Sequence, residues 1–228
     1  MPTDATSDAE TLRRIAADRF TCRAYLPDAV PDETIASIFD IARRTASWSN
    51  VQPWHLTITR QPTTEKFRAA LMEEAAKSHD VESDIPFPES YPGVFGERRR
   101  EVGYQLYAAL GIERHDHARR SQQSFENYRL FGAPHVALVA SAAELGPYGV
   151  VDTGAFIGTF LLAAQAHGVA TTAQAALARH SSFIKSYFGI GPERTFVCGI
   201  AFGYADRDHP VNNYRTGRAK VDEVLKLV

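Results

Sequence analysis

The sequence predicts a single α+β domain. Segments with the hydrophobic periodicity of helices and of strands follow one another irregularly along the 228 residues. A doubly wound parallel sheet would require strands and helices in strict alternation. No G-x-G-x-x-G follows a predicted strand and no G-x-x-x-x-G-K-[ST] occurs, so a dinucleotide held permanently on a Rossmann unit is not expected. Neither a linker nor an internal repeat divides the chain, so we expect one domain over residues 1–228.

The first half of the chain is predicted to be mainly helical. Ser7 followed by Glu10 is a capping-box pattern that starts the first helix, and Pro31 opens the second. Alternating residues at 55–60 indicate a half-buried strand. Three more helices are expected at 62–78, 97–110 and 116–128. Between them, prolines and glycines at 80–96 predict a long irregular loop, and such loops are usually functional or mobile.

The second half is predicted to alternate less regularly between strands and helices. The apolar, β-branched run at 134–140 is typical of a buried strand. An apolar helix is expected at 152–167, an extended segment at 169–175, a short helix at 181–188 and a last strand at 196–204.

Composition excludes several classes of protein. Lysine and arginine number 25 against 27 acidic residues, so nothing suggests a nucleic-acid partner. Two cysteines are too few for a disulfide framework or a four-cysteine zinc site, which indicates a reducing compartment. The N-terminus is polar and acidic, unlike a signal peptide. The longest apolar segment, 154–166, is too short to span a bilayer. We therefore expect a cytoplasmic protein without a membrane partner.

Two arginines flank a hydroxyl directly after the first predicted helix. Arg19, Thr21 and Arg23 lie at alternate positions. Two guanidinium groups around a hydroxyl form a suitable cradle for a phosphate or another anionic group. The alternative is a solvated basic helix end, which the helix dipole would favour.

A second polar segment lies between the second helix and the first strand. It contains Ser47, Ser49, Asn50 and Gln52, followed by a Pro-Trp pair. Carboxamides can read an imide-like edge because each offers both a donor and an acceptor. A simple helix-terminating turn would explain the Pro-Trp pair well but would explain Asn50 and Gln52 poorly.

In their order, these motifs resemble the FMN-dependent nitroreductase family. The resemblance rests on R-x-[ST]-x-R at 19–23 and N-x-Q-P-W at 50–54. Downstream, 152–168, 196–204 and 215–224 are similar to the family's central helix, last core strand and basic C-terminal segment. The resemblance implies a central, mostly antiparallel sheet flanked by helices. It also implies an intertwined homodimer with the FMN site at the subunit interface and a C-terminal extension reaching the partner chain.

The same resemblance assigns residues to parts of the cofactor. Arg19 and Thr21 match positions that hold the FMN phosphate and ribityl end, and Arg23 matches a basic residue near flavin N1 and the C2 carbonyl. Arg215 and Arg218 match a region whose basic side chains close on the phosphate, and Arg218 is favoured as the phosphate contact.

The family's flavin-contact loop corresponds to Ser47, Ser49 and Asn50, with Gln52 either contributing to the contact or only fixing the loop. Ala175 and Ala176 match the strand-end loop whose backbone N–H approaches flavin N5, the reactive centre. Many family members have Glu-Gly there. No catalytic side chain and no metal site is assigned.

The implied function is reduction of an electron-poor acceptor. NAD(P)H would reduce FMN and leave, and a small aromatic acceptor, by default a nitroaromatic, would then take the electrons in a ping-pong order. Two alternatives stay open: an FMN-dependent oxidase or dehydrogenase with oxygen as acceptor, and a flavin-binding module without turnover. The choice between NADH and NADPH is also open.

Two features distinguish this chain within the family. Trp48 is bulky where a small residue is common, so it would cover a flavin face or narrow the pocket. Arginines at 98–100 are similar to a branch that includes 2-nitrobenzoate nitroreductase, where they would suit a carboxylate-bearing substrate. The alternative for these arginines is a solvated helix face. His115 and His117, in an arginine-rich run, are interpreted as surface residues rather than metal ligands.

Overall fold

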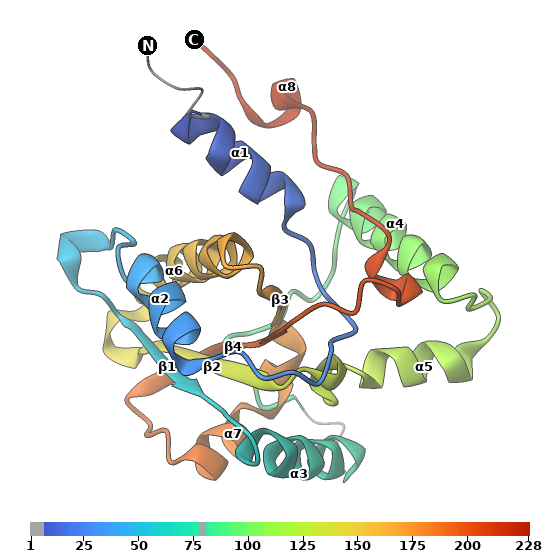
Figure 1. The fold of residues 1–228 in the computed structure, drawn as a ribbon, viewed down its shortest axis with the longest axis horizontal. Helices are drawn as coiled ribbons and strands as arrows, with labels where there is room; N and C mark the ends of the chain where they lie inside the picture. Colours follow the sequence, from blue (N-terminus) through green and yellow to red (C-terminus); the bar gives the residue numbers. More distant parts are fainter. Residues whose placement is uncertain (1–6, 78–80) are drawn as a thin grey trace.

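A four-stranded antiparallel sheet forms the centre of the protein in the computed structural model, which describes residues 7–77 and 81–228. The strand order is β1-β2-β4-β3, and each neighbouring pair is antiparallel. The strands are β1 (Trp54–Ile58), β2 (His135–Ala142), β3 (Ala170–Gln174) and β4 (Arg194–Gly203). The predicted α+β class with a mostly antiparallel sheet is confirmed (Figure 1).

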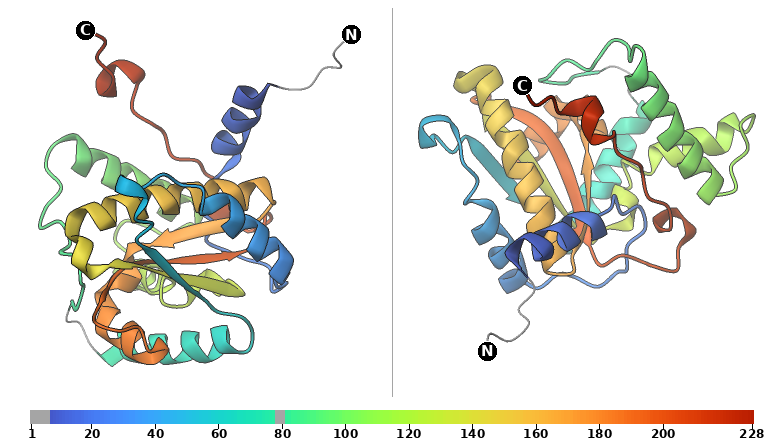
Figure 2. Two further views of the ribbon diagram at one scale, coloured as in Figure 1. Left: turned by 90° about the vertical axis from the view of Figure 1, so that its left-hand side faces the viewer. Right: turned by 90° about the horizontal axis from the view of Figure 1, so that it is seen from above.

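Helices cover both faces of this sheet. Helices α2 and α6 pack on one face, and α3 and α7 pack on the other, while α4 and α5 extend to one side (Figure 2). The α-helices of the described residues are α1 (Asp8–Asp18), α2 (Asp32–Ala42), α3 (Thr63–Lys77), α4 (Val94–Ala109), α5 (His117–Phe125), α6 (Gly146–Ala166), α7 (Ser181–Phe188) and α8 (Val221–Val224).

Strand β2 is buried on both faces, as its apolar run predicts. Successive side chains of a strand point to opposite faces. Val136 and Leu138 therefore join the hydrophobic cluster beneath α3 and α7, whereas Ala137 and Val139 join the cluster beneath α2 and α6. This alternation explains why the sequence of a central strand shows no polar face.

Helix α6 is longer than the sequence predicts. It begins at Gly146 rather than at 152, because Pro147 is tolerated in a first turn. With the preceding turn, residues Ala143–Ala166 are long and apolar enough to cross a membrane by length and composition alone. The short length of the apolar segment 154–166 therefore does not exclude a membrane span. The contacts of buried Phe156 and Phe160 with α2 and the sheet are those of a core helix.

Most other element boundaries shift by a few residues, as is usual for sequence-based boundaries. Strand β1 begins at Trp54 and ends at Ile58, and α4 begins at Val94, inside the predicted loop 80–96. Ser78 and Asp80, at the ends of a predicted helix and that loop, lie outside the described residues. Helix α7 has the predicted bounds, because Gly189 ends it in the left-handed conformation at φ 64°.

His135 is a buried histidine that links β2 to two neighbouring segments. Its Nδ1 lies 2.9 Å from the carbonyl oxygen of Thr59, and its Nε2 lies 3.0 Å from the backbone N–H of Val30. The ring must therefore be neutral, donating from Nδ1 and accepting at Nε2. It also stacks on Phe202. Burial lowers the pKa of His135 below its ordinary value of 6.5.

This arrangement predicts a loss of stability on mild acidification. Because the pKa of His135 is lower in the folded than in the unfolded chain, the unfolded chain binds more protons at a pH between the two values. The contribution of His135 to the free energy of unfolding is therefore complete above about pH 6.5 and falls as the pH decreases. One proton contributes at most about 1.4 kcal/mol per pH unit. Denaturant unfolding between pH 7.5 and 5.5, at fixed protein concentration, should show a shallower decline in His135→Gln than in the parent. The exposed His115→Gln serves as the control, and equal slopes in all three proteins would contradict the assignment.

Candidate cofactor site

The segment after α1 lies along the open edge of β3. Thr21 forms a parallel bridge with Thr171, and the backbone N–H of Cys22 donates to the Thr171 carbonyl at 3.1 Å. The Thr172 hydroxyl donates to the Cys22 carbonyl. Because Arg19 is already extended (φ −65°, ψ 129°), the helix ends at Asp18 and the chain continues as an edge strand (Figure 1).

Alternation along this extended segment separates its polar and apolar side chains. Phe20 and Cys22 pack in a small cluster with Ala170. Arg19, Thr21 and Arg23 line a cavity, and part of the Phe20 ring also lines it. Burial raises the pKa of the Cys22 thiol to about 11, so this thiol is a packing group rather than a nucleophile.

Four arginines converge on this cavity, which has a volume of about 380 Å³. Arg19 and Arg23 come from the edge segment, and Arg215 and Arg218 come from the C-terminal segment. Among the described residues, none of the four forms an ion pair with a carboxylate. Burial and the charge of Arg218 lower the pKa of Arg19. This concentration of positive charge suits a dianionic group such as a phosphate monoester.

Local contacts fix the orientation of two of these arginines. The Nη1 of Arg23 donates to the Tyr214 hydroxyl at 2.8 Å. The Nη1 of Arg215 donates to the carbonyls of Asn212 and Tyr214 at 2.7 and 2.8 Å, and its guanidinium lies 4.1 Å from the centre of the Phe20 ring. Guanidinium groups held in this way lose less entropy when they bind an anion.

Asn212 joins the C-terminal segment to the edge segment, and the sequence analysis did not find it. Its Oδ1 accepts from the backbone N–H of Arg23 at 2.8 Å, and its Nδ2 donates to the carbonyls of Ala24 and Asp206 at 2.9 and 2.7 Å. The side chain is buried. No sequence signal marks a buried asparagine that binds the backbone of a residue 189 positions away in the chain.

The strand end where Ala175 and Ala176 lie forms the other end of the same edge. Strand β3 ends at Gln174, and a 3₁₀ turn at Ala175–His180 follows directly. Ala173 and Ala175 are exposed, and the first N–H groups of a helical turn have no intrahelical partner. From Thr171 to Ala175 the chain covers about 13 Å. The edge therefore offers an anion site at one end and free backbone donors at the other.

The predicted flavin-contact loop, residues 47–52, does not line the arginine cavity. The Trp48 N–H donates to the Asp152 carboxylate at 3.1 Å, and the Trp48 ring packs edge-on against Tyr148 on α6. In Figures 1 and 2, α6 lies between this loop and the two segments that carry the four arginines, and no residue from 47 to 52 lines the arginine cavity. One chain therefore does not bring the two groups of predicted site residues together.

The backbone of this loop is unusual. Ser49, Asn50 and Gln52 all have positive φ, at 51°, 58° and 49°. Such conformations are costly for residues other than glycine and concentrate at functional sites. Gln52 helps to hold the loop, since its backbone N–H donates to Ser47 Oγ at 3.0 Å and its Nε2 donates to the Asn50 carbonyl at 3.2 Å.

Comparison with known proteins places the chain in a family. The Nitroreductase family model matches residues 16–204. Nitroreductase NfnB of Mycolicibacterium smegmatis is 35% identical over 229 aligned positions, covering 100% of this chain and 97% of that protein. A 4-nitrobenzoate reductase of Nocardioides sp. is 33% identical, covering 93% and 88%. The crystal structure of FMN-dependent NfnB from Mycobacterium smegmatis in complex with NADPH superimposes with a TM-score of 0.92 at 34% identity, covering 97% and 100%.

These findings confirm the family resemblance and the nitroreductase-type fold. The narrower likeness to the 2-nitrobenzoate branch stays a prediction, because the benzoate-reducing relative is named for the 4-isomer.

Removing one arginine from the cavity should weaken FMN binding. Arg19→Ala deletes a charge-assisted hydrogen bond of about 1.5–3 kcal/mol, which corresponds to a roughly 10- to 100-fold higher Kd. Titration of flavin-free protein with FMN, followed by flavin fluorescence, measures this change. Arg14→Ala is the control, because Arg14 is exposed and faces Asp18 outside the cavity. An unchanged Kd for Arg19→Ala would contradict the phosphate assignment.

Proposed function

The chain belongs to the nitroreductase family, and we propose that it is an FMN-dependent oxidoreductase that uses NADPH to reduce nitroaromatic acceptors. The observation that carries the proposal is the arginine cavity at one end of the open β3 edge. Relatives described as a nitroreductase dependent on FMN and as a 4-nitrobenzoate reductase support the reaction class.

The residues of this edge fit FMN in order along its length. Arg19, Arg215 and Arg218 would hold the phosphate, and the Thr21 hydroxyl would contact the ribityl chain. Arg23, held by Tyr214, would supply a fixed positive charge on the pyrimidine side of the flavin ring. When bound, FMN supplies the hydride-transfer chemistry, and a cation on that side stabilises the anionic reduced form.

At the far end of the edge, the backbone N–H groups of Ala175 and Ala176 would lie near the N5 edge of the ring. A backbone donor binds an acceptor atom without adding a side chain that would narrow the pocket. The described residues that line the cavity beside Thr172 and Ala173 include no carboxylate and no histidine, which suits a site that admits the reductant and the acceptor in turn. Within one chain Trp48 packs against Tyr148 of α6, so only the loop of a second copy of the chain would bring a Trp48 ring over this pocket.

We further propose that the functional unit is a homodimer. Helix α1 contains no buried residue, and Figure 2 shows α1 and the C-terminal segment extending away from the body. The C-terminal segment exposes large apolar side chains, among them Val224, Leu225 and Leu227. An 11-residue helix is marginal in water without packing partners. A second copy of the chain would cover these surfaces.

Helix α6 supplies a further surface for the second copy. Val151 is 65% exposed on its outer face, and a side chain at Gly154 or Gly158 would meet no atom within 4 Å. Small residues on an apolar helix allow another backbone to approach closely. With α6 at the interface, the Ser47–Gln52 loop of one subunit would face the arginine cavity of the other and complete the site. A cytoplasmic location also belongs to this proposal, supported by the buried unpaired thiols of Cys22 and Cys198.

Anaerobic turnover tests the proposed reaction. Purified protein loaded with FMN should oxidise NADPH only when a nitroaromatic such as 4-nitrobenzoate is added. Initial rates over a matrix of both substrates should give the parallel double-reciprocal lines of a ping-pong mechanism. NADPH oxidation that requires oxygen and ignores the nitro compound would favour an oxidase instead. No reductant consumption under either condition would indicate a flavin-binding module and overturn the proposal.

A further inference from the structure

We propose that a second basic cavity, beside the flavin edge, binds the phosphorylated adenosine end of NADPH and so selects NADPH over NADH. This inference rests on the proposed function. The cavity has a volume of about 790 Å³ and lies between α4, the 110–116 connection and the start of α5. Its lining includes four arginines and two tyrosines: Arg99, Arg100, Arg114, Arg120, Tyr104 and Tyr107.

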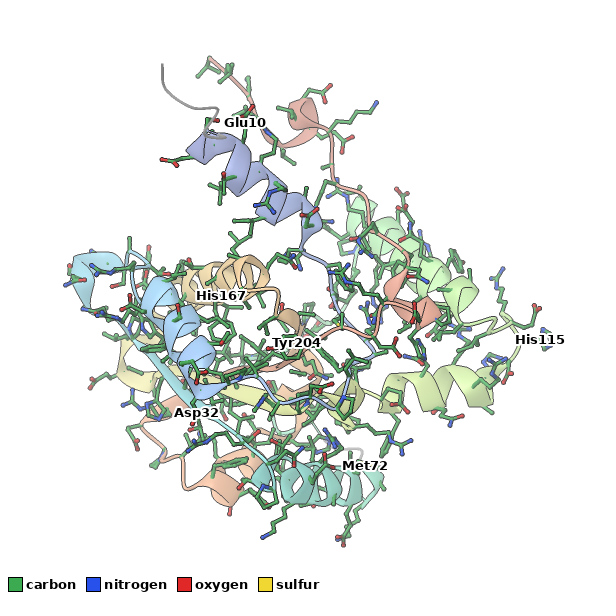
Figure 3. All side chains as sticks on the ribbon, viewed as in Figure 1. Glu10, Asp32, Met72, His115, His167 and Tyr204 are labelled. Carbon is green, nitrogen blue, oxygen red and sulfur yellow. The ribbon has the colours of Figure 1, made fainter. Side chains whose placement is uncertain are left out.

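One face of α4 forms the floor of this cavity. Arg100, Gly103, Tyr104 and Tyr107 are spaced three or four residues apart, so they lie on one side of the helix. Gly103 has no side chain, which leaves a hollow between the larger residues. The connection that carries His115 extends beyond the end of α4 in Figure 3 and contributes Arg114 to the opposite wall.

The arginines in this region fall into two groups, those close to a carboxylate and those that line the cavity. Arg98 pairs with Glu223 at 3.1 Å and Arg119 approaches Asp116 at 4.0 Å, and neither lines the cavity. In the described part of the chain, none of the four lining arginines forms an ion pair with a carboxylate. Glu113 is the single carboxylate among the lining residues. The excess of positive charge is therefore specific to the cavity.

Aromatic rings give the cavity a second recognition element. The Arg120 guanidinium lies 4.8 Å from the centre of the Tyr107 ring, and its Nη1 donates to the Arg114 carbonyl at 3.1 Å. A stacked guanidinium keeps its remaining N–H groups for a phosphate. Tyr104 is 54% exposed and offers a free ring face, on which a purine can stack. Guanidinium groups beside a free aromatic ring suit a nucleotide that carries an additional phosphate.

The size and position of the cavity favour the reductant over a carboxylate-bearing acceptor. Tyr107 also lines a smaller cavity of about 200 Å³ that contains Thr172 and Ala173 of β3. A ligand that occupies both cavities must be long, with one end at the flavin edge and an anionic end on α4. A nitrobenzoate is one ring with one carboxylate, whereas NADPH has the required length. NADPH differs from NADH only by the 2′-phosphate, so the excess of arginines would discriminate between them.

Binding of nucleotide fragments tests this inference without turnover. The FMN-loaded protein should bind 2′,5′-ADP at least about 10-fold more tightly than 5′-AMP, which lacks only the 2′-phosphate, by calorimetry, since one charge-assisted contact contributes about this factor. Arg100→Gln/Arg114→Gln should remove the preference. Arg98→Gln, on the same helix but outside the cavity, should keep it. Equal binding of the two fragments by the parent protein would overturn the proposal.

Steady-state kinetics gives the second readout. In Arg100→Gln/Arg114→Gln, the KM for NADPH should rise about 10- to 100-fold, while the KM for NADH, the FMN content and the KM for 4-nitrobenzoate stay unchanged. A rise confined to 4-nitrobenzoate would show that the cavity reads the acceptor carboxylate and would overturn the proposal. A parent protein that prefers 2′,5′-ADP but turns over no NADPH would refute the proposed function while leaving the binding site in place.

Discussion

The hydrogen bonds that hold Thr21 and Cys22 against the edge of β3, and Leu26 against Tyr204, are the constraint on which the rest of the site depends. They end α1 at Asp18, turn alternate side chains toward the cavity and give Asn212 the backbone groups to which it binds. Through Asn212, the C-terminal segment brings Arg215 and Arg218 to the same place. Guanidinium groups thus meet without a counter-charge, an arrangement that an anionic ligand stabilises by binding the folded state.

The near-neutral composition hides two local concentrations of positive charge. Across the chain, 25 basic residues nearly balance 27 acidic ones. Yet among the residues that the structure describes, the arginines that line the two basic cavities form no ion pair with a carboxylate, whereas Arg98 pairs with Glu223. A smaller cavity that contains Thr172 and Ala173 of β3 shares Thr21 and Arg23 with one basic cavity and Tyr107 with the other. In the proposed function, the two basic cavities would hold the anionic groups of the cofactor and the reductant, and the smaller cavity would lie between them.

The sequence predicted most of the architecture, because it follows from local patterns. The apolar, β-branched run of β2, the capping box of α1 and the Gly189 that ends α7 are all local features of the sequence. The early start of α6 was missed because glycines and a proline in a first turn read as a loop. Asn212 and the α4 cavity were missed because their partners meet only in three dimensions. The separation of Asn50 from Arg19 within one chain likewise has no signal in the sequence.

The central claim is that the arginine cavity of one chain and the Ser47–Gln52 loop of another form one site. Arg19→Ala/Arg218→Ala and Asn50→Gly/Gln52→Gly impair the two halves separately, and glycine tolerates the left-handed backbone of the loop. After subunit exchange, half of the dimers are mixed and each has one intact site. Nitroaromatic reduction by the mixture should therefore recover to about a quarter of the parent rate. Activity that stays at the average of the two variants would contradict the shared site.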